Sequence, residues 1–173
     1  MNANEHKAGY RIEKVYVADQ AYRIVADQEQ PSVNSAADRK IAFGWDWRPL
    51  SARRFEVVIT VTIEPSKDSP EQVSVRLIGL FTADDGELSI GFAEFLRVNA
   101  PAILFPYARE IISTMTGRGP FGAFHLNPIN VPALLAGVDI TVSTGHRTLR
   151  DNPEFAKSFG LPVELEVPAA PTT

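Results

Sequence analysis

Apolar residues alternate with polar ones, or run in β-branched clusters, at four places in the first half of the chain. Alternation puts every second side chain on one face of an extended backbone, so each of these stretches is predicted to be a strand. The most β-branched of them is FEVVITVTI, a composition that favours a pleated backbone. In chain order, the predicted strands span residues 10–25, 40–47, 55–63 and 73–81.

The first predicted strand breaks its own alternation. Its apolar period slips at Lys14–Val15, which indicates a β-bulge or a change of face. The third and fourth strands are separated by a short polar turn that contains two prolines, so they are predicted to pair as a hairpin. These two strands therefore form the expected centre of a sheet.

The second half of the chain changes to helical spacing. An apolar stripe recurs at spacings of one, three and four between Ile103 and Met115, which is the pattern of one helix face. Pro101 suits a first helical turn, where a missing N–H costs nothing. Pro106 removes a hydrogen bond one turn further in, so the helix is predicted to kink there or to start late. The glycines of the following TGRG sequence are predicted to end it.

Shorter helical patterns lie on either side of this helix. Four strands followed by helices is the order of an α+β domain, in which the helices pack on one face of a four-stranded antiparallel sheet. This is the fold class that we predict. The short helices are expected at residues 88–98, 132–136 and 152–159, and an extra strand at 138–142.

The loop after the long helix is unusually apolar, because aromatic and aliphatic residues alternate there with Gly and Pro. Surface loops are usually polar. Such a loop therefore needs either a surface to cover or an apolar partner to bind. Its apolar members are Phe121, Phe124, Leu126, Ile129 and Val131.

Composition narrows the range of functions. A chain of 173 residues, 45% hydrophobic and 22% charged, is typical of one globular domain. A net charge of −4 without a basic stripe argues against binding of nucleic acid. The start, MNANEHKAGY, is not a signal peptide, and no apolar run approaches the roughly 18 residues of a membrane span. We therefore expect a cytoplasmic protein that does not insert into a membrane.

The sequence contains few residues in the patterns that are typical of catalytic or metal sites. The chain has no cysteine, and His6, His125 and His146 lie in separate regions without metal-ligand spacing. No Ser or acid near His125 in the sequence completes a nucleophile–base set. The GRGP sequence is not a phosphate loop, because no strand precedes it and no Lys-Ser or Lys-Thr follows it. We expect no enzyme, no cofactor and no metal, and an enzyme that depends on His125 is the minor alternative.

The stretch from Ile103 to Asn130 resembles the SecB family of export chaperones. Its sequence ILFPYARE is followed in order by Arg-Gly, an aromatic residue at Phe121, and LNPIN. A match of this length and order is far more specific than a lone glycine-rich loop. The chain departs from the family pattern at several positions, which indicates a divergent member. The departures are Ala100 and Ala102 for Cys and Asn, Gly122 for Pro, and Val131-Pro132 for Phe-Asp.

The resemblance implies an ATP-independent holdase that binds unfolded polypeptides, namely preproteins for Sec-dependent export. It also implies a homo-tetramer in which client segments lie in apolar grooves between the sheet and the loop. For each groove candidate, the alternative is that it fills the core of the single chain. The candidates are Trp45, Trp47, Phe121, Phe124, Leu126, Ile129 and Val131.

The resemblance also defines the expected domain organisation. The part of the chain after Gly137 does not resemble the family, whose members end with a helix and an acidic tail. We expect a disordered start, a SecB-like domain and a divergent C-terminal extension, over residues 1–9, 10–137 and 138–173.

Family members deliver clients to the SecA motor through acidic residues on the outer face of the sheet. The first-strand acid carries over to Asp19, for which the alternative is a solvated strand-end acid. A second family acid falls on Arg23, and the acid of the fourth strand falls near Ser74. Replacing an acid by a base reverses the local attraction to a basic partner. Export therefore stands beside two alternatives: a dedicated SecB-like chaperone of one client, such as an antitoxin, and a non-chaperone domain that binds a small ligand or a partner strand.

The width of the helical stripe between Ile103 and Met115 adds one expectation. A single four-stranded sheet cannot easily cover this stripe together with the preceding helix. We expect a second subunit to cover the rest, in a dimer or tetramer.

Overall fold

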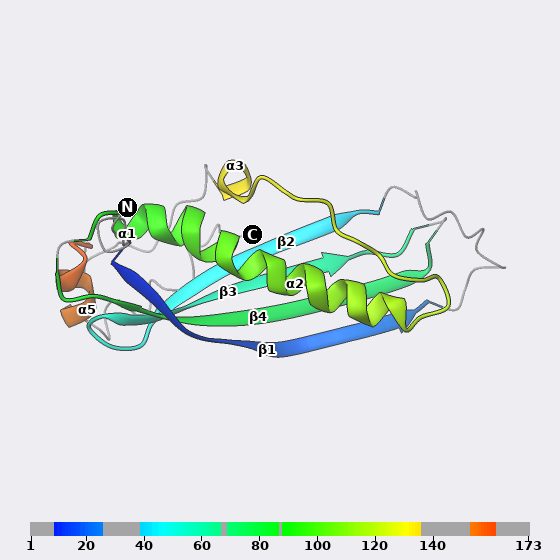
Figure 1. Ribbon diagram of the computed structural model, residues 1–173, viewed down its shortest axis with the longest axis horizontal. Coiled ribbons are helices and arrows are strands. Elements are labelled where there is room, and N and C mark those ends of the chain that lie inside the picture. The colour runs from blue at the N-terminus through cyan, green and yellow to red at the C-terminus, as the bar shows by residue number, and fades with distance from the viewer. Residues whose placement is uncertain (1–8, 26–38, 67–68, 87, 136–152, 162–173) are drawn as a thin grey trace, which may run out of the picture.

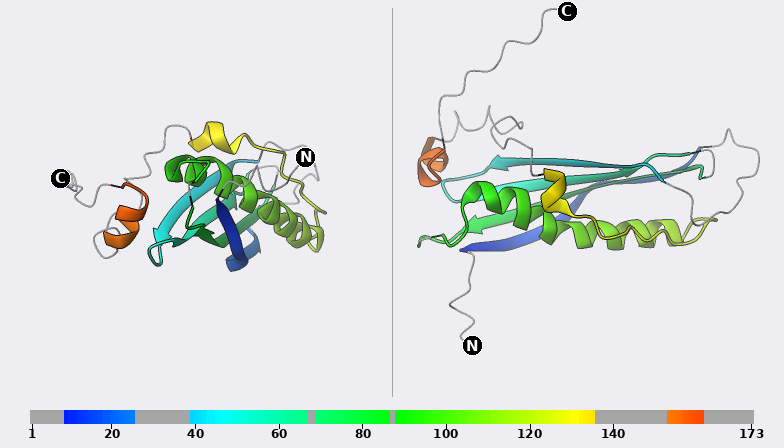
Figure 2. Two further views of the ribbon diagram at one scale, coloured as in Figure 1. Left: turned by 60° about the vertical axis from the view of Figure 1, so that its left-hand side comes forward. Right: turned by 90° about the horizontal axis from the view of Figure 1, so that it is seen from above.

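The computed structural model consists of an antiparallel four-stranded sheet with one long helix lying across a single face, which confirms the predicted α+β class (Figure 1). Figure 2 shows the same arrangement from two further directions. The structure describes residues 9–25, 39–66, 69–86, 88–135 and 153–161.

All four predicted strands are present, and each lies within a few residues of its expected bounds. The sheet order is β1-β4-β3-β2, so β1 and β2 form its two edges. β3 and β4 are antiparallel neighbours, which confirms the predicted hairpin. The strands are β1 (Tyr10–Ile24), β2 (Ile41–Pro49), β3 (Arg54–Ile63) and β4 (Glu71–Ala83).

β1 is irregular, as its sequence predicts. Its pairing with β4 shifts register between Ile12 and Lys14, at the position of the predicted slip, and again between Val17 and Asp19, which was not predicted. Each shift inserts one extra residue, so side chains that are separated by an odd number of positions lie on the same face of the sheet. Tyr10, which lies before both shifts, and Val15, which lies between them, therefore both pack against the core.

The long helix is the last part of a continuous helical segment. α1 (Phe92–Glu94) leads into a π-helical turn, η2 (Phe95–Asn99), and then into α2 (Ala100–Gly117). In the wide turn, the backbone N–H of Ala100 donates to the carbonyl of Phe95, five residues back. Pro106 lies inside α2, so the helix does not start late, and it ends at Gly117 as predicted.

α2 packs on the sheet through one line of its predicted stripe. Leu104, Ala108 and Ile112 are fully buried against the apolar face of β3 and β4. Gly79 on β4 allows this close approach, because a Cβ there would lie 2.7 Å from the Leu104 Cδ2 atom. The other line of the stripe stays outside: Tyr107 is 49% exposed in the single chain. The stripe is therefore only partly covered by its own sheet.

Two short helices complete the described structure, and both were predicted. α3 (Val131–Leu135) follows the apolar loop, and α5 (Pro153–Ser158) lies at one end of the sheet (Figure 1). Among the helices that the structure describes, none is long and apolar enough to cross a membrane. The expected disordered start and the expected strand at 138–142 lie outside the described residues.

Candidate functional site

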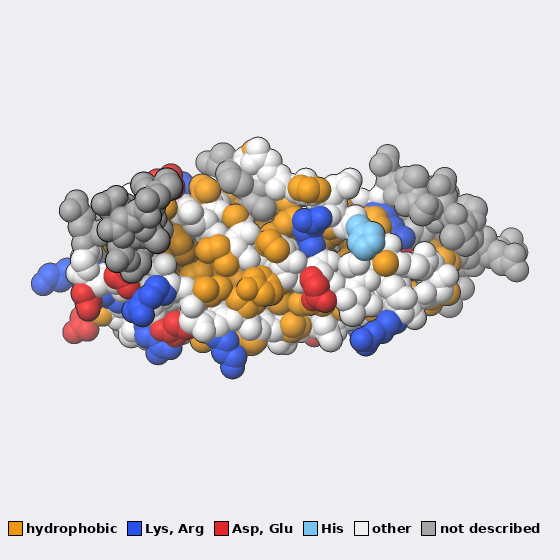
Figure 3. Space-filling view, in the orientation of Figure 1, with side chains coloured by type: hydrophobic (Ala, Val, Ile, Leu, Met, Phe, Trp, Pro, Cys, Tyr) orange, Lys and Arg blue, Asp and Glu red, His pale blue; other side chains and the backbone are white. Residues whose placement is uncertain are grey.

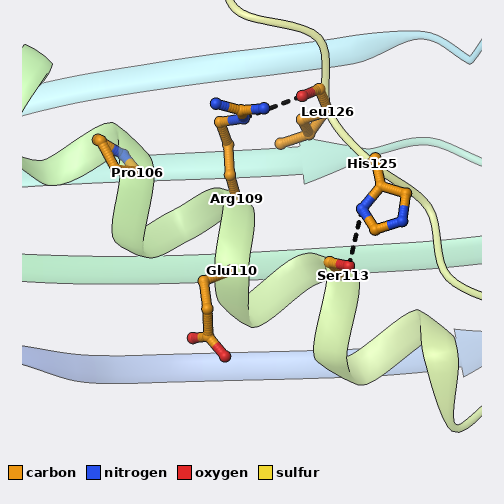
Figure 4. Close-up of a pocket in the computed structure, with 6 residues that line it drawn as sticks. All are labelled: Pro106, Arg109, Glu110, Ser113, His125 and Leu126. Atoms are coloured by element: carbon orange, nitrogen blue, oxygen red, sulfur yellow. Dashed lines mark hydrogen bonds between the residues drawn. The ribbon is translucent and has the colours of Figure 1, made fainter.

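The apolar loop between α2 and α3 runs back alongside α2 (Figure 1) and is tied to it by side chains. Arg109 donates from Nε to the backbone carbonyl of Leu126 at 2.9 Å, and the Ser113 hydroxyl lies 3.0 Å from Nδ1 of His125 (Figure 4). Because Arg109 and Ser113 are four residues apart, they project from the same side of the helix. Arg109 therefore holds the loop against α2.

A third tie is buried. Thr116 is fully buried, and its hydroxyl donates to the carbonyl of Ile112 at 2.8 Å. The same oxygen accepts the backbone N–H of Phe124 at 2.8 Å. A loop N–H that would otherwise lack a partner is thereby satisfied by the helix. The loop is thus fixed in place by polar bonds, although its own side chains are largely apolar.

A buried ion pair anchors the loop to the sheet as well. Glu71, at the start of β4, is fully buried and lies 2.7 Å from an Nη1 atom of Arg39, whose side chain is 7% exposed. The Tyr22 hydroxyl donates to the other carboxylate oxygen at 2.8 Å. The guanidinium of Arg39 lies over the ring of Phe124, 4.3 Å from its centroid. Arg39 therefore connects a loop aromatic to the end of the sheet.

The surroundings of Tyr22 keep this cluster tightly packed. Burial, followed by the hydrogen bond to Glu71, raises the pKa of Tyr22 to about 12, so its hydroxyl remains a donor at neutral pH. Gly119, at the start of the loop, lies so close that a side chain there would collide with the Tyr22 hydroxyl. A glycine is therefore required where the loop leaves the helix.

A small hollow of about 290 Å³ lies between α2 and the loop. It brings Ser113 next to His125, although the two residues lie twelve positions apart in the sequence. Glu110 lines the same hollow, but its carboxylate accepts from the Thr114 hydroxyl at 2.9 Å and points away from His125 (Figure 4), so it does not orient this histidine as a catalytic base requires. Across the described parts of the chain, no cluster of three or more potential metal ligands occurs.

The predicted groove residues fall into two sets. Trp45, Phe121, Phe124 and Ile129 are partly buried and keep some surface in contact with solvent. The Trp45 indole donates to the carbonyl of Leu96 at 3.2 Å, which fixes the ring beside η2. The other set is buried in the single chain: Trp47 and Leu126, each 2% exposed. Val131 begins α3, and its side chain lies outside what the structure describes.

The outer face of the sheet carries the residues considered for a motor contact. Asp19 is exposed on β1 and lies opposite Arg76 of β4. Arg23, further along the same face, lies opposite Gln72. Between them is a hollow of about 200 Å³, lined by Asp19, Ala21, Arg23, Gln72 and Ser74. This part of the outer face therefore carries both acidic and basic side chains.

The fold is that of a SecB-like chaperone. A solved structure of such a chaperone from Mycobacterium tuberculosis, in complex with a peptide from an antitoxin, superposes with a TM-score of 0.57 at 16% sequence identity. The superposition covers 70% of this chain and 92% of the other. This similarity concerns the arrangement of strands and helices.

The sequence goes further: the chain belongs to the SecB family. Residues 3–138 match the family described as "Preprotein translocase subunit SecB". The "Protein-export protein SecB" of Alcanivorax borkumensis is 30% identical over 151 residues, covering 76% of this chain and 87% of that protein. The protein of the same description from Blochmanniella pennsylvanica is 28% identical, covering 78% and 88%. The predicted resemblance is confirmed.

Proposed function

We propose that this protein is an ATP-independent holdase, and that unfolded polypeptides bind to its apolar loop and to Trp45 on β2. The observation that carries this proposal is the construction of the loop. Polar bonds from α2 and the Arg39–Glu71 pair hold it in one place, while Phe121, Phe124 and Ile129 keep partial exposure. Many weak apolar contacts suit a partner of variable sequence.

An aggregation assay tests this role. A chemically denatured client is diluted into buffer without nucleotide, and light scattering is followed with near-equimolar chaperone. We expect suppression by the wild type and a marked loss in the double variant Phe121→Ser/Ile129→Ser. Tyr16→Ser is the matched control, because Tyr16 is 36% exposed but lies opposite Ile78 on the face of the sheet away from α2. Failure to suppress aggregation of several clients, together with saturable binding of one small ligand, would favour the non-chaperone alternative.

The export role is the preferred form of this function, with the cytoplasm as its location. It is supported by family membership and by the relatives named protein-export proteins. The alternative, one dedicated client, is favoured by the antitoxin peptide bound to the structural neighbour and by Arg23 on the outer face. A pull-down separates them. If the wild type retains the SecA motor and the Asp19→Lys variant does not, the export role is supported. If the wild type retains one small protein and not the motor, a dedicated chaperone is supported.

Assembly into a homo-tetramer is part of this proposal. Figure 3 shows hydrophobic side chains gathered over the N-terminal half of α2. Ile103 and Tyr107 of α2 are 38% and 49% exposed, and Val17 on the edge strand β1 is 42% exposed. A second copy of the chain that covered them would gain roughly 25 cal/mol for each Å² of apolar surface buried. Light scattering at micromolar concentration should give four times the 19.0 kDa chain mass, and a monomer mass would contradict assembly.

A further inference from the structure

The short helix α5 covers an apolar surface of the SecB-like domain from outside the family match. The match ends at residue 138, and α5 spans Pro153–Ser158. Its residues Phe155 and Ala156 are fully buried, and Phe159 follows one turn after Phe155. Phe155 and Phe159 therefore present two aromatic rings on one side of a short segment.

The surface that receives these rings is itself aromatic. It is formed by Trp47 of β2, Phe55 of β3 and Phe92 of α1. The ring centroid of Phe155 lies 5.9 Å from Trp47 and 5.3 Å from Phe92, and that of Phe159 lies 4.3 Å from Phe92. These are the distances at which aromatic pairs attract one another. The surface therefore has the size and chemistry of a site for two aromatic side chains.

α5 is held on this surface by packing. Its described hydrogen bonds are internal, such as Phe159 N–H to Phe155 carbonyl at 3.2 Å and Leu161 N–H to Ala156 carbonyl at 2.9 Å. A helix of six residues is far below the length at which an isolated helix is stable, so its helical form depends on docking. A hollow of about 320 Å³ lies at the seam, next to Phe92 and Phe159. Contacts of this kind are not directional, so another apolar segment can replace them.

We propose that Trp47, Phe55 and Phe92 form a further client-binding site, which takes aromatic side chains of unfolded polypeptides and which α5 occupies as an intramolecular competitor. The inference rests on the proposed holdase function. The chemistry of the ligand follows from that of the present occupant, which is two phenylalanines four residues apart. A client segment with aromatic residues at such a spacing displaces α5, and the free site is available only for the fraction of time that α5 is undocked.

Hydrogen exchange on the unmodified full-length chain tests the displacement. The probe is a reduced and alkylated protein that stays unfolded, added to saturation. We expect faster exchange of the Phe159 and Leu161 amides, together with slower exchange in the apolar loop. Unchanged or slower exchange in α5, with protection of the loop, would overturn the inference and leave the holdase function standing. Absence of protection anywhere, without suppression of aggregation, would overturn both.

A variant pair supplies the second measurement. Phe159→Ala weakens the docking of α5, whereas Lys157→Ala changes an exposed residue of the same helix. If α5 is docked about 90% of the time, its removal from competition tightens client binding by up to about tenfold. We expect a several-fold lower dissociation constant for Phe159→Ala and no change for Lys157→Ala. Equal or weaker binding by Phe159→Ala, in a variant that circular dichroism shows to be folded, would contradict the proposal.

Discussion

Two apolar segments pack on the sheet and helix, α5 at one end of the sheet and the loop alongside α2 (Figure 1), and they are attached in different ways. The loop after α2 is bonded through Arg109, Ser113 and Thr116, and it rests on the buried Arg39–Glu71 pair. α5 is attached through the rings of two phenylalanines, and its described hydrogen bonds are internal. Directional bonds fix a position, whereas apolar contacts fix only an area of burial.

This difference matches the two roles assigned to the segments. A binding loop that collapsed onto its own core would bury the side chains it should present, and polar anchors prevent that collapse. A segment that must yield to a client cannot have such anchors. Three variants test whether the loop is fixed and whether α5 is replaceable, and a fourth, on the outer face of the sheet, is expected to change little.

Arg39→Met should be the most destabilising change. It leaves the Glu71 carboxylate buried without a counter-charge, which costs about 3–5 kcal/mol. It also removes the cation over Phe124, so client binding should weaken together with stability. The control is Lys40→Met, because the neighbouring Lys40 side chain is 78% exposed and its ion pair with Glu64 lies at the surface.

Denaturant unfolding measures both changes. Adding Glu71→Leu to Arg39→Met should restore much of the lost stability, since a buried pair replaced by apolar residues is often tolerated. If Arg39→Met cost no more than Lys40→Met, the loop would not be anchored by this pair.

Phe155→Ala tests whether α5 is separable from the cooperative core. Truncation of a buried phenylalanine usually costs about 3–5 kcal/mol. Because α5 can leave its site without unfolding the sheet, we expect a loss in global stability below that range. The control is Phe81→Ala, because Phe81 is 1% exposed within β4 and should show the full cost. Equal losses in denaturant unfolding would mean that α5 is an integral part of the core.

Thr116→Val tests the buried tie of the loop. Valine has the shape of threonine but cannot accept the Phe124 N–H, and an unsatisfied buried donor costs about 1–3 kcal/mol. Hydrogen exchange of the Phe124 amide should accelerate, and client affinity should fall with it. Thr114→Val, at an exposed position two residues earlier, is the control and should leave both unchanged. If the Phe124 amide still exchanged slowly in the Thr116→Val variant, the loop would be held by other contacts.

Glu13→Gln should have the smallest effect, because this residue lies on the exposed outer face. Hydrogen bonds from Arg54, followed by Thr82, lower the pKa of Glu13 below its usual 4.5. A lowered pKa contributes stability that is present above pH 4.5 and is lost as the pH falls through the pKa of the folded state. The melting temperatures of wild type and variant should therefore differ slightly at pH 7 and converge in acid. A difference that grew in acid would contradict this assignment.

Strands with one buried face could be predicted from their alternating pattern, and β3, which is buried on both faces over residues 55–59, could be predicted from its β-branched residues. The apolar loop could be recognised because its composition is wrong for a surface loop. The anchors of the loop could not be predicted, since Arg39 and Glu71, or Ser113 and His125, meet only after distant segments fold together. Trp47 is a second example. The alternation of β2 predicts which face of the strand carries this side chain, but only the structure shows that α5 covers it.

If the loop holds the unfolded client, a photoreactive group placed on the loop should cross-link to that client. The chain has no cysteine, so a single one introduced as Phe121→Cys can carry a photoreactive group, with Tyr16→Cys as the control on the opposite face of the sheet. We predict that the group at position 121 captures a denatured client but not the same protein when folded, and that the group at position 16 captures neither. Equal capture from both positions, or none from position 121, would contradict the account.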